Sequence, residues 1–164
     1  MRKELQDYLI KKYPKIYTEV GENEPFALFG FECNDGWFRL ILWLSRYIEQ
    51  YIEQQNEMAE KFPNNYLPVK QLKAVQVKEK FGTLRYYYNG GNEHLSNIIT
   101  YTEYLSGFIC EQTGKTNDVG YNRTGWIKTH HVELSKNKKD FFFLDDKELR
   151  DILKNDLNQL KLDI

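Results

Sequence analysis

The stretch that most restricts how this chain can fold is residues 74–91, where two runs of alternating residues flank a short Phe-Gly-Thr sequence. Alternation with a period of two is typical of a β-strand with one face toward the core. Gly82 can take the positive φ that a tight turn needs. We therefore predict a β-hairpin, with strands at residues 73–80 and 84–88, and with the Asn-Gly-Gly sequence at 89–91 ending the second strand.

The alternation also assigns side chains to the two faces of the hairpin. In the first strand, Val75 and Val77 are expected on one face, and the opposite face carries Gln76, Lys78 and Lys80. In the second strand, one face carries Arg85 and Tyr87, and the other carries Leu84, Tyr86 and Tyr88. Cations and aromatic rings therefore lie close together, an arrangement that suits either an anionic ligand or an ordinary solvated sheet face.

Four segments carry apolar residues at helical spacing. The first covers residues 2–13 and ends at Pro14. The longest begins at Asn34 or Asp35, either of which can cap it, and runs to Phe62 with a continuous apolar stripe. A third helix starts at Asn92 and ends near residue 110. The last opens at Asp145 with a pattern similar to a capping box.

The remaining segments complete an α+β protein. Residues 25–33 suggest a short strand or extended segment, and residues 114–125 a polar, glycine-rich loop. Residues 126–134 are predicted to form a strand, with which residues 141–144 pair back. Because helices and hairpins mix without a βαβ rhythm, we expect one α+β domain over residues 1–164, with a small antiparallel sheet packed against amphipathic helices.

Composition excludes several classes of protein. The formal net charge is −1, whereas general nucleic-acid binding needs a cationic excess, so we expect no such binding. No apolar stretch reaches membrane-spanning length, and the polar N-terminal residues do not resemble a signal peptide. The two cysteines, Cys33 and Cys110, are too few for a disulfide framework. We therefore expect a cytoplasmic protein without membrane contact.

Three blocks together resemble a family of small uncharacterised proteins found in phages, prophages and bacterial genomes. The blocks are residues 30–37 (GFECNDGW), residues 75–87 (VQVKEKFGTLRYY) and residues 110–134. The resemblance covers most of residues 30–134. It implies a phage or mobile-element protein acting in the cytoplasm of a bacterial host cell, and it implies no particular activity.

The resemblance also implies a degenerate zinc-knuckle-like region. Family members look as if they carry Cys-x-x-Cys-Gly, then Gly-Trp, then a second Cys-x-x-Cys. This chain keeps Cys110, while the other three cysteine positions hold Thr113, His131 and Leu134. A structural zinc site needs four ligands, and threonine and leucine supply none. We therefore expect no metal and no cofactor, although the sequence leaves open whether Cys110 and His131 bind any metal.

No complete catalytic motif is present, so we do not expect an enzyme. His94-x-Ser96 matches one of the two signatures of a two-histidine phosphodiesterase, and a second signature is missing. Cys33 has no histidine near it in sequence, and Cys110 lies at the C-terminal end of a predicted helix, where the dipole disfavours a thiolate. Phosphate-binding and dinucleotide-binding glycine loops are also missing. A hydrolase of nucleotide-like substrates that uses His131 and Asp118 remains an alternative.

Binding is the function that these residues favour. Arginine can clamp a phosphate with two hydrogen bonds, and tyrosine or tryptophan can stack on a base. The candidate ligand-binding residues are Lys78, Lys80, Arg85, Tyr87, Arg123, Trp126, Lys128 and His131. The leading hypothesis is a non-enzymatic accessory protein that binds and sequesters a small anionic nucleotide-like ligand, such as a host defence signal. The alternative is a protein-interaction module, such as an inhibitor or immunity protein. The exposed sheet edges and the tyrosine-rich surface also suggest a homodimer.

Overall fold

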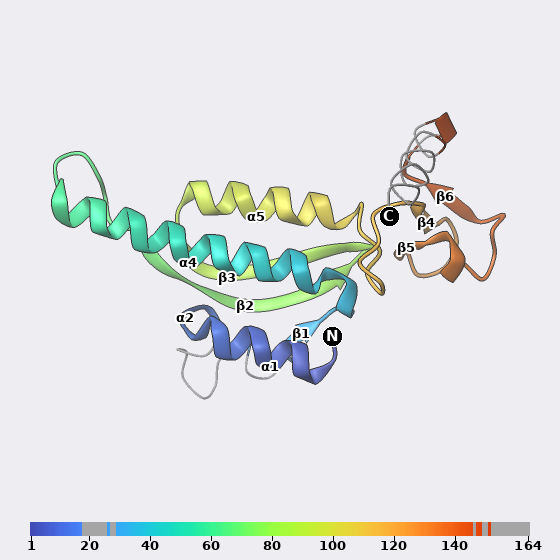
Figure 1. Ribbon diagram of the computed structural model, residues 1–164, viewed down its shortest axis with the longest axis horizontal. Coiled ribbons are helices and arrows are strands. Elements are labelled where there is room, and N and C mark those ends of the chain that lie inside the picture. Colours follow the sequence, from blue (N-terminus) through green and yellow to red (C-terminus); the bar gives the residue numbers. More distant parts are fainter. Residues whose placement is uncertain (18–25, 27–28, 146, 149–150, 152–164) are drawn as a thin grey trace, which may run out of the picture.

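The computed structural model describes residues 1–17, 26, 29–145, 147–148 and 151, and it is an α+β protein as predicted. The larger sheet has the order β1-β2-β3 and consists of β1 (Phe31–Glu32), β2 (Lys70–Lys80) and β3 (Thr83–Gly91). β1 runs parallel to β2, and β2 pairs antiparallel with β3. The hairpin of β2 and β3 is the long central element of the molecule (Figure 1).

Helices pack along this hairpin. The N-terminal pair consists of α1 (Lys3–Lys12) and α2 (Pro14–Tyr17). After β1, the short 3₁₀ helix η1 (Asp35–Trp37) leads into α4 (Phe38–Lys61), and α5 (Glu93–Ser106) follows the hairpin. Figure 1 shows α4 and α5 side by side along β2 and β3, with α1 and α2 beyond the opposite edge in this view. Among the described residues, no helix combines the length and apolarity that a membrane span requires.

The hydrophobic core lies where α1, α4 and the inner face of the sheet meet. Its fully buried side chains include Leu9, Trp37, Ile41, Ile48, Leu72, Val77 and Leu84. A chain of hydroxyl groups crosses this core, because Tyr86 donates to Tyr17 at 3.1 Å and Tyr17 lies 2.7 Å from Ser45 Oγ. Burial raises the pKa of both phenols, so they stay protonated hydrogen-bonding groups.

The hairpin differs from the prediction in two details. A register shift between Ala74 and Gln76 inserts Val75 as an extra residue, so the buried positions are Leu72, Ala74 and Val77, and Val75 does not share the face of Val77. The second strand also does not stop at Tyr88. Gly90 lies so close to the backbone of Gln71 that a Cβ atom would overlap it, and this close approach lets β3 continue to Gly91.

A second, smaller sheet follows α5, in the order β5-β4-β6. It contains β4 (Val119–Asn122), β5 (Thr129–His131) and β6 (Phe141–Phe143), and the 3₁₀ helix η2 (Val132–Leu134) follows β5. The predicted loop at residues 114–125 therefore contains a strand, and the predicted strand at 126–134 is only three residues long. β6 pairs with β4 and not with β5, because the chain between Asn122 and Thr129 turns back on itself.

The helix predictions are correct in type, with corrections at the ends. α1 ends at Lys12, directly before Pro14, as predicted, and Pro14 then begins α2, where its missing N–H costs nothing. Asn34 and Asp35 make no side-chain cap, because Asp35 instead accepts from the backbone of Arg2 and pairs with its guanidinium. Asn92 does cap α5 through Leu95 N. Phe62 is half exposed and does not continue the buried stripe. The helix predicted after Asp145 lies mostly outside the described residues.

Candidate functional site

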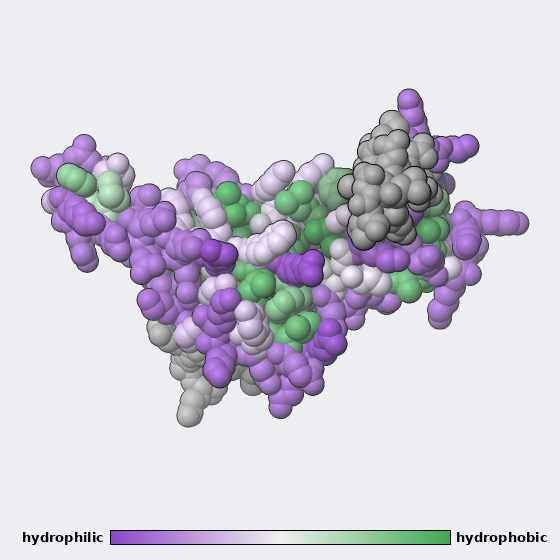
Figure 2. Space-filling model, viewed as in Figure 1, coloured by the Kyte–Doolittle hydropathy of each residue, from purple (hydrophilic) through white to green (hydrophobic). Residues whose placement is uncertain are grey.

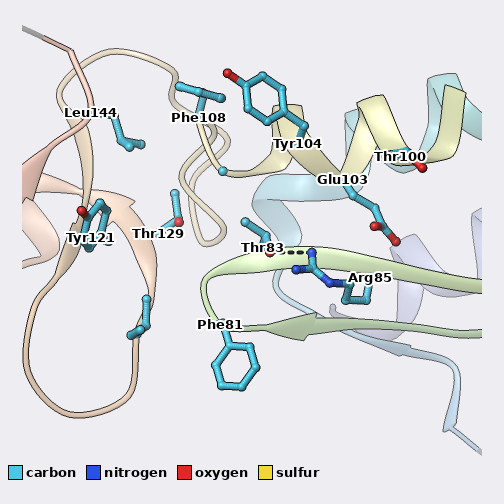
Figure 3. A pocket seen from close by; sticks show the side chains of 12 residues that line it. Phe81, Thr83, Arg85, Thr100, Glu103, Tyr104, Phe108, Tyr121, Thr129 and Leu144 are labelled. Carbon is cyan, nitrogen blue, oxygen red and sulfur yellow. Dashed lines mark hydrogen bonds between the residues drawn. The ribbon is translucent and has the colours of Figure 1, made fainter. Parts of the chain in front are cut away.

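A large cavity lies where the tip of the hairpin, the C-terminal end of α5 and the second sheet meet (Figure 3). Its volume is about 600 Å³, within the range typical of small-molecule sites. The hairpin contributes Phe81, Thr83 and Arg85; α5 and the residues after it contribute Thr100, Glu103, Tyr104, Gly107 and Phe108; and the second sheet contributes Tyr121, Ile127, Thr129 and Leu144.

The turn of the hairpin places an exposed aromatic ring at the cavity. Phe81 and Gly82 form a two-residue turn in which both have positive φ, 53° and 79°. This turn type matches the twist of the two strands, but it is uncommon for a bulky residue such as phenylalanine. Gly82 fits against Thr129, whose Oγ1 would lie 3.1 Å from an added Cβ atom. The result is a Phe81 ring that is 69% exposed.

The end of α5 is fixed to the free edge of β3 by two side chains. Ser106 Oγ accepts from Leu84 N at 2.8 Å, and a Glu103 carboxylate oxygen accepts from Tyr86 N at 2.7 Å. These bonds satisfy edge amides that would otherwise be open to another strand. They also hold the outer side of α5 at the cavity, where the rings of Tyr104 and Phe108 lie edge to face with their centroids 5.1 Å apart.

Arg85 supplies the positive charge of the cavity. One of its terminal nitrogens donates to Thr83 Oγ1 at 2.6 Å and to the Leu84 carbonyl at 2.7 Å, which orients the guanidinium (Figure 3). Within the described part of the chain, Arg85 has no carboxylate partner within 4.0 Å. Lys78 lies directly opposite it on β2. Like charges at directly opposed positions repel, while Glu32 on β1 stands opposite Lys78 on its other side.

The eight predicted ligand-binding residues do not share one cavity. Lys78, Lys80, Arg85 and Tyr87 lie on the outer face of the hairpin as predicted, but only Arg85 lines the large cavity. The Lys80 ammonium group lies 5.6 Å from the centroid of the Phe81 ring. Tyr87 lies opposite Gln76 and is 42% exposed.

The other four predicted residues lie elsewhere. Trp126 and Lys128 line a second, more polar cavity of about 300 Å³, together with His130 and Asp140. Arg123 lies over the ring of Phe142, with 4.8 Å between its guanidinium carbon and the ring centroid. Buried His131 accepts from Glu133 N through Nδ1 at 3.3 Å. The hairpin and residues 123–131 therefore contribute to two separate candidate sites.

A carboxylate holds the tip of the hairpin to the segment that follows α5. One oxygen of Glu79 accepts from Gly82 N at 2.7 Å, and the other accepts from Trp126 Nε1 at 3.1 Å. Trp126, predicted as a stacking residue, therefore contacts the hairpin through its polar edge. Its ring remains 70% exposed beside the second cavity.

A second carboxylate, Glu111, is buried beside the start of η1. One of its oxygens accepts from both the backbone N and the side-chain Nδ2 of Asn34, each at 2.9 Å. Burial raises the pKa of Glu111, and the nearby Glu79 charge adds to this, while the Asn34 hydrogen bonds and Lys128 oppose it. The folded protein therefore holds this proton more tightly than the unfolded chain does.

We expect the Glu111→Gln variant to differ from the wild type in the pH dependence of its stability. A carboxyl with a raised folded-state pKa gives stability that falls as pH rises, from about pH 4 until the group is ionised in the folded protein. Glutamine keeps an oxygen acceptor for Asn34 and does not titrate. Urea unfolding of both proteins at several pH values should show the wild type losing stability relative to the variant above pH 4. A difference that is constant with pH would contradict this.

The residues of the hydrolase alternative do not meet at the large cavity. His131 and Asp118 lie outside its lining, and the Asp118 carbonyl accepts from Val132 N. Among the described residues, no three His, Cys, Asp or Glu side chains are grouped closely enough to hold a metal ion. Burial raises the pKa of the Cys33 thiol to about 12, which leaves it protonated and unreactive.

Sequence reasoning missed most of the aromatic lining. Phe81 was assigned only to the turn, and Tyr104, Phe108 and Tyr121 were not selected. Tyr104 and Phe108 lie four residues apart and off the buried stripe of α5, and that spacing is a signal that could have marked an exposed aromatic pair. Comparison of this chain with protein-family models, with curated proteins and with solved structures finds no match.

Proposed function

We propose that the protein binds a small organic anion that carries a flat ring, in the cavity at the tip of the hairpin, and that it acts by holding this molecule. The observation that carries the proposal is a single guanidinium, Arg85, set in a cavity whose lining is otherwise mostly apolar and aromatic. A nucleotide-like ligand has this combination of negative charge and aromatic ring.

The arrangement of Arg85 supports an anionic ligand. The contacts to Thr83 and Leu84 use one terminal nitrogen of the guanidinium, so the others can donate to a phosphate or carboxylate. Lys78, opposite Arg85, adds charge and has no ion pair within the described residues. An anion bound here would relieve the repulsion between the two cations, which is a gain that a neutral ligand cannot provide.

The other side chains of the cavity favour a ring with hydrogen-bond donors. Phe81, Tyr104 and Phe108 line it and have exposed rings, and an exposed ring can stack on a base. Glu103 also lines the cavity, and one of its oxygens already accepts from Tyr86 N. Its carboxylate can accept from an exocyclic amino group or a sugar hydroxyl. A simple inorganic anion would gain neither contact.

The biological setting belongs to the same proposal. The phage or mobile-element context comes from the resemblance of residues 30–134. A protein of that kind with a ligand cavity would act as an accessory factor that sequesters a nucleotide-derived signal of the host. Holding such a molecule requires oriented contacts and no catalytic group, and this open cavity brings together a cation, one carboxylate and several rings.

The test is to measure binding of a panel of linear and cyclic mono- and dinucleotides by calorimetry, with orthophosphate as a probe of charge alone. For any nucleotide that binds, Arg85→Ala should weaken the affinity by about 10- to 100-fold, since a hydrogen bond to a charged group contributes about 1.5–3 kcal/mol. Arg85→Lys keeps the charge without the planar fork, so its affinity should fall between the two.

Lys128→Ala is the matched control, because it removes one cation from the second cavity and leaves the first unchanged. Its affinity should equal that of the wild type. If Arg85→Ala and Lys128→Ala lose affinity equally, the ligand binds elsewhere or the loss is a general effect of charge. Failure of every nucleotide in the panel to bind at millimolar concentration would overturn the proposal.

A further inference from the structure

The side of α4 opposite the core carries a ridge of exposed residues that continues along the whole helix. The ridge follows a spacing of four and three residues, and its members are Arg39, Trp43, Arg46, Gln50, Glu53, Glu57 and Glu60. The spacing resembles the seam of a coiled coil, although this ridge faces solvent. Its cations occupy the N-terminal half of the helix, and its carboxylates the C-terminal half. Trp43, the large apolar side chain among these seven, is 66% exposed.

These charges are placed against the preference of their own helix. A helix favours carboxylates in its first turn and cations in its last, because of its macrodipole. α4 has no acidic residue in its first turn, where Arg39 lies, and Glu60 lies in its last turn. Glu53 and Glu57 repel each other at a spacing of four residues, while Glu57 pairs with Lys61 of the last turn at 3.8 Å. Apart from this pair, the charge pattern of the ridge does not stabilise α4 in an isolated chain.

The cations of the ridge also lack partners in the same chain. Neither Arg39 nor Arg46 forms an ion pair within the described residues. Lys12 on α1 lies near Arg46; its hydrogen bond to Tyr8 raises the pKa of Lys12, and the positive charge of Arg46 opposes this. The N-terminal half of the ridge is thus positive and the C-terminal half is negative. The helix that carries both halves has 24 residues and is about 36 Å long.

We infer that two copies of this chain associate through their α4 ridges, packed antiparallel about a two-fold axis beside Gln50. In this register, Arg46 of each copy faces Glu53 of the other, and Arg39 faces Glu60. The two Trp43 side chains lie on either side of the axis, each toward the acidic half of the partner helix. Antiparallel helices also place opposite dipole ends together.

A second copy fits this surface better than an unrelated partner does, because the surface is complementary to itself. A two-fold interface uses the same patch on both chains, so each contact occurs twice. Arg46 and Glu53, and likewise Arg39 and Glu60, lie at equal sequence distances from the point between Glu49 and Gln50 and have opposite charge, as a self-complementary patch requires. Figure 1 shows that the C-terminal end of α4 extends beyond α5, and Figure 2 shows hydrophilic side chains over that end. A partner helix can therefore approach along the full ridge.

The experiment is a charge exchange measured by sedimentation equilibrium at low ionic strength. The wild type should be dimeric. Arg46→Glu places carboxylates opposite Glu53 twice, and Glu53→Arg places cations opposite Arg46 twice, so each variant alone should dimerise at least about tenfold more weakly. An equimolar mixture of the two variants restores both opposite-charge contacts and should recover the dimer. The double variant Arg46→Glu/Glu53→Arg should dimerise like the wild type.

Lys136→Glu, an equal charge change on an exposed loop of the second sheet, is the control and should leave the dimer unchanged. Circular dichroism and thermal unfolding should show that all variants fold. Raising the salt concentration to 0.5 M should weaken the wild-type dimer, since exposed charges are screened. A monomeric wild type, or a mixture that stays monomeric, would overturn the inference. So would single variants that dimerise as tightly as the wild type.

Discussion

Replacing Trp37 with alanine is expected to lower the free energy of unfolding by about 3–5 kcal/mol, the range typical of a large aromatic side chain removed from a core. Trp37 is fully buried at the junction of η1 and α4. Its Nε1 donates to the Ile109 carbonyl at 3.0 Å, which ties the start of α4 to the chain that follows α5. Since small proteins are stable by about 5–15 kcal/mol, the variant should be close to unfolding at room temperature.

Urea unfolding followed by circular dichroism measures this effect, and Trp37→Phe separates its two causes. Phenylalanine keeps most of the apolar volume but leaves the Ile109 carbonyl without its donor, so its loss should be smaller, about 1–3 kcal/mol. If Trp37→Ala and Trp37→Phe lose the same free energy of unfolding, the lost hydrogen bond and not the lost packing accounts for most of the effect. If alanine costs less than about 1 kcal/mol, the burial of Trp37 does not support the core as we describe it.

Replacing Gly36 with alanine should produce the second large loss of stability, about 3 kcal/mol. A methyl group at this position would overlap the Cys110 carbonyl and lie 2.5 Å from Gly114 N. Gly36 N also donates to the Glu111 carbonyl at 2.7 Å. Because the obstructing atoms belong to the backbone, no side chain can rotate away to make room. The loss should reach the upper part of the range for overpacked sites.

Gly125→Ala is the comparison for Gly36→Ala. Gly125 has φ of 75° but no atom within 4 Å of an added Cβ atom. Alanine there should cost only the strain of the left-handed conformation, about 1–2 kcal/mol. The two variants, compared by urea unfolding, therefore distinguish crowding from backbone strain. A smaller loss for Gly36→Ala than for Gly125→Ala would show that residues 110–114 move aside without cost.

The sequence by itself determined the elements whose pattern is long and local. The α4 stripe, the Asn92 cap and the faces of Arg85 and Leu84 were predictable because each depends on residues near in sequence. The tight turn at Gly82 followed from one residue that tolerates positive φ. The bulge at Val75 was not predictable, because it depends on how β2 and β3 pair, and alternation alone does not reveal an extra residue.

The tertiary structure alone decided where the candidate site lies. Arg85 was identified from the sequence as a cation on the hairpin face, but its neighbours at the cavity, Tyr104 and Tyr121, come from α5 and from the second sheet. Trp126 was expected to join Arg85, yet its indole N–H binds Glu79 and its ring lies beside a different cavity. Residue spacing reports which side chains share a face of one element. Which elements then meet is set by packing and by edge contacts such as that of Glu103 with β3, and these join residues distant in sequence.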